Sequence, residues 1–216
     1  MEFVILTIFP KIFESYLKES LLAKAQANKI IKIKIYNIRD YTFDKHKKVD
    51  DPPYGGGPGM VMKVEPIYRC LKQIKKKKKS RVILLDPRGQ QFDQKKANNY
   101  SKLNQLIIIC GRYEGVDERL KEFIDESISI GPYVLSGGEV AAMTIIEATA
   151  RLIKGFVGDQ ESLKEETFNW QEKPFEYPKY TRPAVFITGK KKLAVPKALL
   201  SGNHAKIRGW QESQRK

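Results

Sequence analysis

Up to about residue 155 the chain alternates short apolar runs with segments of helical periodicity, and this alternation restricts the folds open to it. The apolar runs are rich in Ile, Val and Leu and are mostly continuous, as in parallel strands buried on both faces. Strands are predicted at residues 3–8, 31–36, 82–85, 106–110 and 127–130. Helices are predicted at residues 11–27, 64–77, 94–102, 116–123 and 139–154. This order predicts an α/β fold built on a parallel sheet.

Composition changes after Gly155, and the change predicts a second region. Residues 158–178 are acidic and aromatic, contain prolines and show no clear period, so we expect a flexible linker there. Residues 179–216 are basic with little apolar content, and a piece of this size cannot hold a core of its own. We therefore expect an α/β domain at 1–157, a linker at 158–178 and a short basic C-terminal extension at 179–216.

The apolar content bounds the environment of the protein. Of 216 residues 41% are hydrophobic, enough to bury a core. No apolar run reaches the roughly 18 residues that a membrane span needs, and the first residues lack the basic start of a signal peptide. Cys70 and Cys110 lie inside apolar patterns and are expected to be buried free thiols. These features predict a cytoplasmic protein with no membrane association.

The charge of the chain predicts a polyanionic partner. Forty Lys and Arg residues against 25 Asp and Glu give a net charge of +15, which makes nucleic acid the first candidate. The run Lys75–Lys79 has two interpretations. It either ends a helix that begins near Val64, where cations are favourable to the helix dipole, or contacts RNA. We favour the helix end.

Three loops that follow predicted strands are the most distinctive in the chain: Asp86–Gly89, Gly111–Gly115 and Ile130–Glu139. Ligands of such sheets bind at the carboxyl ends of the strands, so we expect the three loops to form one pocket. Their glycines leave backbone groups open to a ligand, which suits a flat, polar, adenine-like molecule. Ser136 and Glu139 have the spacing of a capping box at the start of the last helix.

Other motifs are open to simpler interpretations. The glycine loop 55–60 is not followed by Gly-Lys-Ser/Thr, so it indicates close passage of backbone rather than a nucleoside triphosphate site. In the loop after residue 110, Arg112 is either a surface charge or part of a site in which Tyr113 and Glu114 face the ligand. The two histidines, His46 and His204, lie far apart, and no metal-ligand spacing is present.

Taken together, the motifs resemble the TrmD family of bacterial tRNA (guanine-N1-)-methyltransferases, in the SPOUT class. The matching segments are Phe9-Pro10, Arg39-Asp40-Tyr41, Val49–Met60, Cys110–Arg119, Tyr133–Glu139, Tyr180-Thr181-Arg182-Pro183 and Leu200–Ala205. They follow the family order over almost the whole chain. The resemblance implies S-adenosylmethionine as methyl donor, tRNA as substrate, and as target the guanine immediately 3′ of the anticodon, position 37. It also implies a trefoil knot in the α/β domain, a homodimer and assistance by Mg²⁺, for which the sequence shows no convincing ligands.

The resemblance also assigns residues to the site. Donor binding is implied for Leu85, Pro87, Gly111, Tyr113, Glu114, Ile130, Gly131, Tyr133, Val134, Leu135, Gly137 and Gly138. Contacts to tRNA are implied for Asp50, Pro58, Gly59, Ser201 and His204. Arg151 matches the arginine that serves the target base, and Glu166 occupies the position of the catalytic Asp.

The chain departs from the family pattern at three places. Glu166 replaces the family's Asp, Pro132 stands where an acidic residue is usual, and little of the family's C-terminal helical domain follows Trp210. We expect the last difference to reduce tRNA affinity more than donor binding. The alternative to an active methyltransferase is therefore an RNA-binding homologue with weak or lost turnover.

Overall fold

The structure, a computed structural model, describes residues 1–158, 168 and 176–215. The chain divides into two compact units, Met1–Gly158 and Asp159–Lys216, and each is described by itself.

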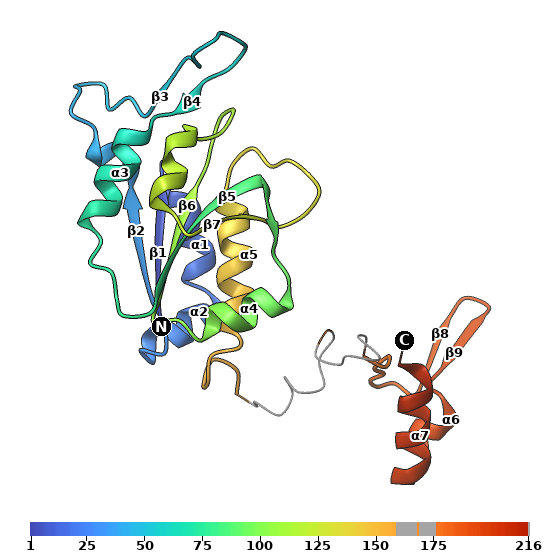
Figure 1. Ribbon diagram of the computed structural model, residues 1–216. Helices are drawn as coiled ribbons and strands as arrows, with labels where there is room; N and C mark the ends of the chain where they lie inside the picture. Colours follow the sequence, from blue (N-terminus) through green and yellow to red (C-terminus); the bar gives the residue numbers. More distant parts are fainter. Residues whose placement is uncertain (159–167, 169–175, 216) are drawn as a thin grey trace. The chain divides into compact units, whose positions relative to one another are not determined.

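The first unit is built on a five-stranded sheet of order β2-β1-β6-β5-β7, in which every neighbouring pair is parallel (Figure 1). Its strands are β1 (Glu2–Thr7), β2 (Lys32–Asn37), β5 (Ser80–Gln91), β6 (Gln105–Cys110) and β7 (Glu126–Ser129). The five strands predicted from apolar runs are confirmed, and with them the α/β class. The short pair β3 (Asp50–Asp51) and β4 (Val61–Met62) is antiparallel and separate.

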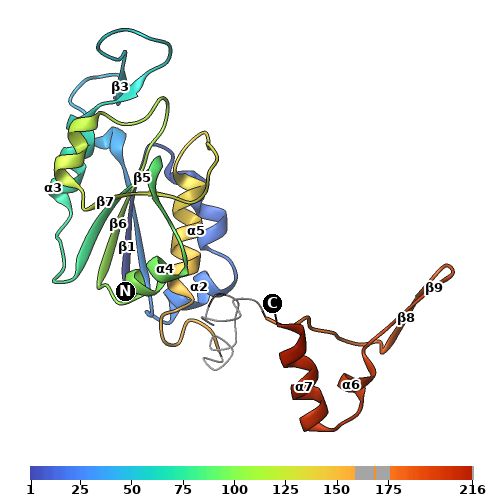
Figure 2. The ribbon, with the colours of Figure 1, turned by 45° about the vertical axis from the view of Figure 1, so that its right-hand side comes forward.

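The core lies on both faces of this sheet. In β1 the side chains of Phe3 and Ile5 belong to one buried cluster, and those of Val4 and Leu6 belong to the other. This alternation explains why the strand reads as one continuous apolar run. Figure 2 shows α3 (Val64–Gln73) on one side of the sheet and α5 (Glu139–Ala150) on the other.

Several predicted helices differ from those observed. The single helix expected at 11–27 is three pieces, η1 (Pro10–Phe13), α1 (Glu14–Leu17) and α2 (Ser20–Ala27), because Ser20 has a φ of 53°. The helix expected at 116–123 is the 3₁₀ helix η3 (Glu118–Phe123), and η2 (Ile38–Tyr41) is another. α4 (Gln94–Ser101) is confirmed within one residue.

The interpretation of Lys75–Lys79 as a helix end is wrong. α3 ends at Gln73, and the buried Ile74 that follows has an extended backbone. The lysines therefore lie in the connection to β5, which reaches the end of the sheet near the N-terminus (Figure 1). The Ile74 side chain packs in the core, and this tertiary contact overrides the helix propensity of the lysines that follow.

The second unit contains the hairpin of β8 (Val185–Thr188) and β9 (Lys191–Ala194), followed by α6 (Lys197–Leu200) and α7 (His204–Gln214). None of its described residues is buried. This agrees with the expectation that the region holds no core of its own. Across the described ranges of both units, no helix is long and apolar enough to span a bilayer.

Candidate functional site

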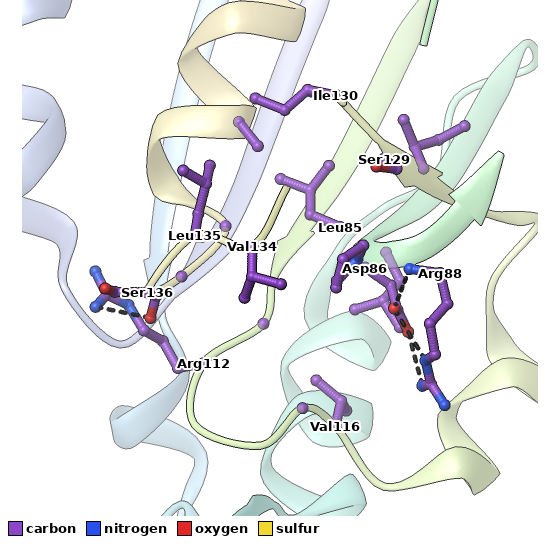
Figure 3. Close-up of a pocket in the computed structure, with 18 of the residues that line it drawn as sticks. Leu85, Asp86, Arg88, Arg112, Val116, Ser129, Ile130, Val134, Leu135 and Ser136 are labelled. Atoms are coloured by element: carbon purple, nitrogen blue, oxygen red, sulfur yellow. Dashed lines mark hydrogen bonds and ion pairs between the residues drawn. The ribbon is translucent and has the colours of Figure 1, made fainter. Parts of the chain in front are cut away.

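A cavity of about 360 Å³ lies at the carboxyl ends of β6 and β7, beside the irregular segment of β5 between Leu85 and Gln90 that contains the predicted loop Asp86–Gly89. The three glycine- and proline-containing loops predicted to meet there all contribute to its walls. Figure 3 shows Leu85, Ile130, Val134 and Leu135 as the apolar part of the lining. Volume and lining are typical of sites for small organic ligands.

The cavity brings together nearly all the residues expected to hold a donor. Its lining includes Leu85, Pro87, Gly111, Tyr113, Glu114, Ile130, Tyr133, Val134, Leu135, Gly137 and Gly138. Gly131 is not part of the lining, because its amide and carbonyl group both bond to the Ser129 hydroxyl at the end of β7. Lining residues that were not predicted include Asp86, Arg88, Arg112, Val116, Ser129 and Ser136. All six lie in or beside the predicted motifs, so their position at or next to the end of a predicted strand could have indicated that they line the site.

Arg112 joins two of the loops and is not the surface charge of the simpler interpretation. Its Nε donates to Glu139 Oε2 at 2.9 Å, and its Nη1 donates to the carbonyl oxygen of Ser136 at 3.2 Å. The Glu139 carboxylate is almost fully buried and also accepts from the Thr7 hydroxyl at 2.7 Å. The guanidinium lies 4.7 Å from the centre of the Phe9 ring, an additional favourable contact for a cation.

This arrangement shows that the predicted capping box is wrong. α5 begins at Glu139 itself with Gly138 as its N-cap, and no side chain caps the helix. A capping box needs its acidic residue at the third helical position. Glu139 occupies the first, and its carboxylate is used by Arg112 and Thr7 instead.

Gly138 is required by close packing of main chain. A Cβ atom there would lie 2.8 Å from Cys110 Cα and 3.1 Å from Gly111 N, and the Gly138 amide donates to the Gly111 carbonyl at 2.9 Å. Backbone of the third loop thus lies directly on backbone of the second. The bridge between Arg112 and Gly137 continues this contact.

Charges in the cavity wall are largely paired. Arg88 donates to both carboxylate oxygens of Asp86, at 3.2 and 2.9 Å, and these bonds hold the pKa of Asp86 below its ordinary value. Arg112 is paired with Glu139. Glu114 is the remaining charged group of the lining and forms no ion pair with any described residue. Glu114 is therefore the carboxylate of the lining that is available to a positively charged ligand.

The glycine loop 55–60 approaches this site through Glu114. A Cβ atom on Gly59 would lie 2.5 Å from Glu114 Cγ, and the Glu114 amide donates to the Met60 carbonyl at 3.0 Å. The close neighbours of Gly59 are side-chain atoms, and a Cβ atom on Gly55, Gly56 or Gly57 would meet nothing within 4 Å, so the predicted close passage of backbone does not explain these glycines. All four have a positive φ, which favours glycine. Asp50 is half-buried at the start of the same β3–β4 connection, which also contains Pro58.

The remaining predicted residues lie outside the cavity. Arg151 is the half-buried C-cap residue of α5. Ser201 and His204 belong to the second unit, where they flank the start of α7. Glu166 lies outside the described residues. No group of three or more His, Cys, Asp or Glu side chains suited to a metal ion occurs in the described parts of the chain.

Fold and cavity define an α/β protein with a cavity of the size and lining that suit a small organic ligand. The sequence profile described as tRNA (Guanine-1)-methyltransferase TrmD matches residues 1–216. A tRNA (guanine-N(1)-)-methyltransferase of Dictyoglomus turgidum is 53% identical over 210 residues, covering 97% of this chain and 83% of the relative. The enzyme of the same name from Carboxydothermus hydrogenoformans is 52% identical over 215 residues, covering 99% and 82%.

The chain belongs to the TrmD family of tRNA (guanine-1)-methyltransferases. This confirms the resemblance inferred from the motifs. It also confirms the interpretation of the chain as a transferase.

Proposed function

We propose that the protein transfers a methyl group from S-adenosylmethionine to N1 of the guanine immediately 3′ of the anticodon, position 37 of tRNA. The observation that carries the proposal is the cavity at the carboxyl ends of β6 and β7, lined by two family motifs in a chain that the family profile matches throughout. Membership of the family shows that the protein is a methyltransferase that modifies tRNA.

The lining of the cavity suits this donor better than a nucleoside triphosphate. Apolar side chains of Leu85, Ile130 and Leu135 offer surfaces for a flat purine, and loop backbone offers hydrogen bonds. Both arginines of the lining are already paired with carboxylates, so a polyphosphate would find no available cation there. The unpaired Glu114 favours a ligand that carries positive charge, as the sulfonium and ammonium groups of the donor do.

The chemistry requires a base and a cation on this chain. Guanine N1 carries a proton at neutral pH, so a carboxylate must accept it as the N1–C bond forms. We assign this role to Glu166, which occupies the position of the family's catalytic Asp. Negative charge that develops on O6 is stabilised by a nearby arginine, for which we propose Arg151. When bound, the donor supplies the methyl group, whose bond to sulfur breaks as the thioether leaves.

Binding of tRNA is proposed for two regions. Asp50, Pro58 and Gly59 belong to the β3–β4 connection that touches Glu114, which supports a role beside the donor. Ser201 and His204 lie in the basic region 179–216, which we propose contacts tRNA after a linker at 158–178. The net charge of +15 supports association with a polyanion. Assistance by Mg²⁺ is part of the proposal as the family resemblance implies it, although the described residues contain no cluster of His, Cys, Asp or Glu that would hold the ion.

The family also supports further properties of the whole protein. We propose that the donor loops form a trefoil knot, that two copies assemble into a homodimer with the sites at the interface, and that the enzyme acts in the cytoplasm. Exposed apolar side chains at Tyr133, Val134 and Val140, beside the cavity, support burial of this surface in a dimer.

Donor labelled with tritium in its methyl group, mixed with unmodified tRNA, tests the function through acid-insoluble label. We expect label that depends on guanine at position 37 and is lost when that base is replaced. Label at another base would contradict the target. Tight tRNA binding with no transfer under any condition would favour the RNA-binding homologue.

A further inference from the structure

The connection between α3 and β5 presents five consecutive lysines, Lys75–Lys79, all of them exposed. Because α3 ends at Gln73, the helix dipole does not explain them. Five like charges in adjacent residues repel one another, so a chain gains no stability from grouping them without an opposing charge.

The backbone of this connection is held in place by buried polar groups. Gln105, which is 1% exposed, donates through Nε2 to the Lys75 carbonyl at 3.3 Å and accepts from the Lys77 amide at 3.1 Å. The Lys79 carbonyl accepts from the amides of Asn104 and Gln105. The connection is therefore an ordered part of the sheet end, and its lysine side chains project from a defined backbone.

Glu2 gathers further positive charge at the same place. Its buried carboxylate lies 3.2 Å from Lys34 Nζ and 3.6 Å from Lys77 Nζ, and it accepts from Gln105 Nε2 at 2.8 Å. Lys32 lies beside Glu2 in the β1–β2 register and is exposed. Within the described ranges, Lys32, Lys75, Lys76, Lys78 and Lys79 form no ion pair. One carboxylate thus accompanies seven lysines.

We infer that these seven lysines, Lys32, Lys34 and Lys75–Lys79, form a docking surface for the phosphate backbone of tRNA, remote from the base that is methylated. The inference rests on the proposed function for the identity of the RNA. It names a contact region of that substrate outside the reaction site. We call this set the amino-edge surface.

The amino-edge surface lies too far from the cavity to contact the base that is methylated. Glu2 and Thr7 are the two ends of β1, and Thr7 bonds to Glu139 beside the cavity. Five residue steps along the strand separate them, about 17 Å. The surface therefore lies at the opposite edge of the sheet from the cavity and cannot touch a base that is held there.

The chemistry of the amino-edge surface favours phosphates over other partners. Lysine ammonium groups neutralise phosphates and release counterions without reading sequence. No large apolar side chain is exposed between residues 72 and 81, so the connection offers neither a platform for base stacking nor an anchor for a lipid surface.

The test is a variant with Lys75, Lys76, Lys78 and Lys79 all changed to Gln, which leaves Lys77 to its bond with Glu2. The control removes the same four charges at exposed positions elsewhere in the first unit, with Lys18, Lys24, Lys45 and Lys95 changed to Gln. Affinity for unmodified tRNA is measured from about 50 to 300 mM salt, and donor affinity by calorimetry confirms that both variants are folded.

We expect the four-lysine variant to bind tRNA roughly 10-fold more weakly than the control near 0.15 M salt. Its slope of log K against log salt should be smaller in magnitude by about 2 or more, since each lost phosphate contact removes about 0.7–0.9. KM for tRNA should rise with kcat unchanged. Equal slopes for variant and control, with donor bound normally, would overturn the inference and leave the methyltransferase proposal intact. Absence of methyl transfer by the unaltered protein would instead contradict the function, while the binding slopes would still decide the surface.

Discussion

Arg112 Nε donates to the buried carboxylate of Glu139 at 2.9 Å, and this bond connects the loop after β6 to the first residue of α5. The same guanidinium reaches the Ser136 carbonyl, so one side chain sets the distance between two walls of the cavity. Thr7, at the end of β1, holds the other oxygen of Glu139. The cavity is thus tied to β1, the neighbour of the central strand β6, by two side-chain bonds.

Arg112→Lys should loosen the cavity without removing charge. A lysine has one ammonium group and cannot bond to Glu139 and the Ser136 carbonyl in the same planar fork. We expect unfolding free energy to fall by about 1–3 kcal/mol and donor affinity to fall roughly 10-fold, measured by urea unfolding and calorimetry. Arg119→Lys, at an exposed arginine paired with Asp117, is the control and should change neither. Equal effects of the two changes would refute the role assigned to Arg112.

Gly138→Ala tests the contact between backbones. The added methyl group meets Cys110 Cα and Gly111 N, neither of which can move alone, so both loops must shift. We expect a loss of about 1–3 kcal/mol of stability and a clear loss of donor affinity. Gly209→Ala, inside α7 with open space around it, should be neutral or stabilising by about 0.5–1 kcal/mol. Normal donor binding by Gly138→Ala would show that the donor lies elsewhere.

Glu114→Gln tests whether the cavity selects a positive ligand. Loss of the unpaired carboxylate should lower the affinity for S-adenosylmethionine several-fold. The affinity for the product, which lacks the sulfonium charge, should fall less. Calorimetric titration of both ligands measures the difference. Glu122→Gln, at an exposed carboxylate on η3 outside the lining, is the matched control. Parallel losses for both ligands would mean that Glu114 acts through shape rather than charge.

Glu166→Gln tests the proposed base. Transfer should be almost abolished while donor affinity stays within a few-fold, because the amide cannot accept the N1 proton. Glu165→Gln should have a mild effect, and Glu166→Asp should retain or improve turnover, since the family uses Asp there. Single-turnover methylation with excess enzyme measures the chemical step. A damaging Glu165 change beside a harmless Glu166→Gln would show that the assignment is shifted by one residue.

Glu2 should contribute to stability in a pH-dependent way. Burial opposes its charge, but hydrogen bonds from Gln105 and Lys34 and the charges of Lys77 and Lys34 outweigh this and hold its pKa below the ordinary 4.5. A lowered pKa means that the stabilisation is present above the unfolded value and is lost as the pH falls through the folded value.

Glu2→Gln should therefore lower the free energy of unfolding by about 1–2 kcal/mol at pH 7. The difference in unfolding free energy from the unaltered protein should become smaller below about pH 4.5. Urea unfolding at pH 7 and at pH 3.5 measures it. Glu122→Gln, an exposed carboxylate, should show little gap at either pH. If the difference in unfolding free energy between Glu2→Gln and the unaltered protein grew at low pH, the pKa of Glu2 would be raised rather than lowered in the folded state.

The sheet and the meeting of three loops followed from periodicity, because a strand buried on both faces has a composition that little else shares. What failed was local. Ser136 and Glu139 match a capping box by spacing, but helix start and side-chain direction depend on Arg112 and Thr7, which are distant in sequence. The periodicity also predicts that the helix continues into the lysine run. In the structure α3 ends at Gln73, because Ile74 is buried in the core in an extended conformation. Long-range contacts of this kind leave no periodic trace.

β5 pairs with β7 on both sides of the irregular segment between Leu85 and Gln90, and Ile128 is the partner of both residues. Gly89 packs so closely on Ser127 and Ile128 that an added Cβ atom would lie 2.5 Å from their backbone. The segment of the cavity wall that contains Pro87 is therefore held at both ends by its contacts with β7. Adjustment to different ligands must come from the opposite wall, where Tyr133 and Val134 are exposed. Inhibitors that differ only at the Pro87 side should discriminate sharply by shape, whereas bulk added toward Val134 should be tolerated.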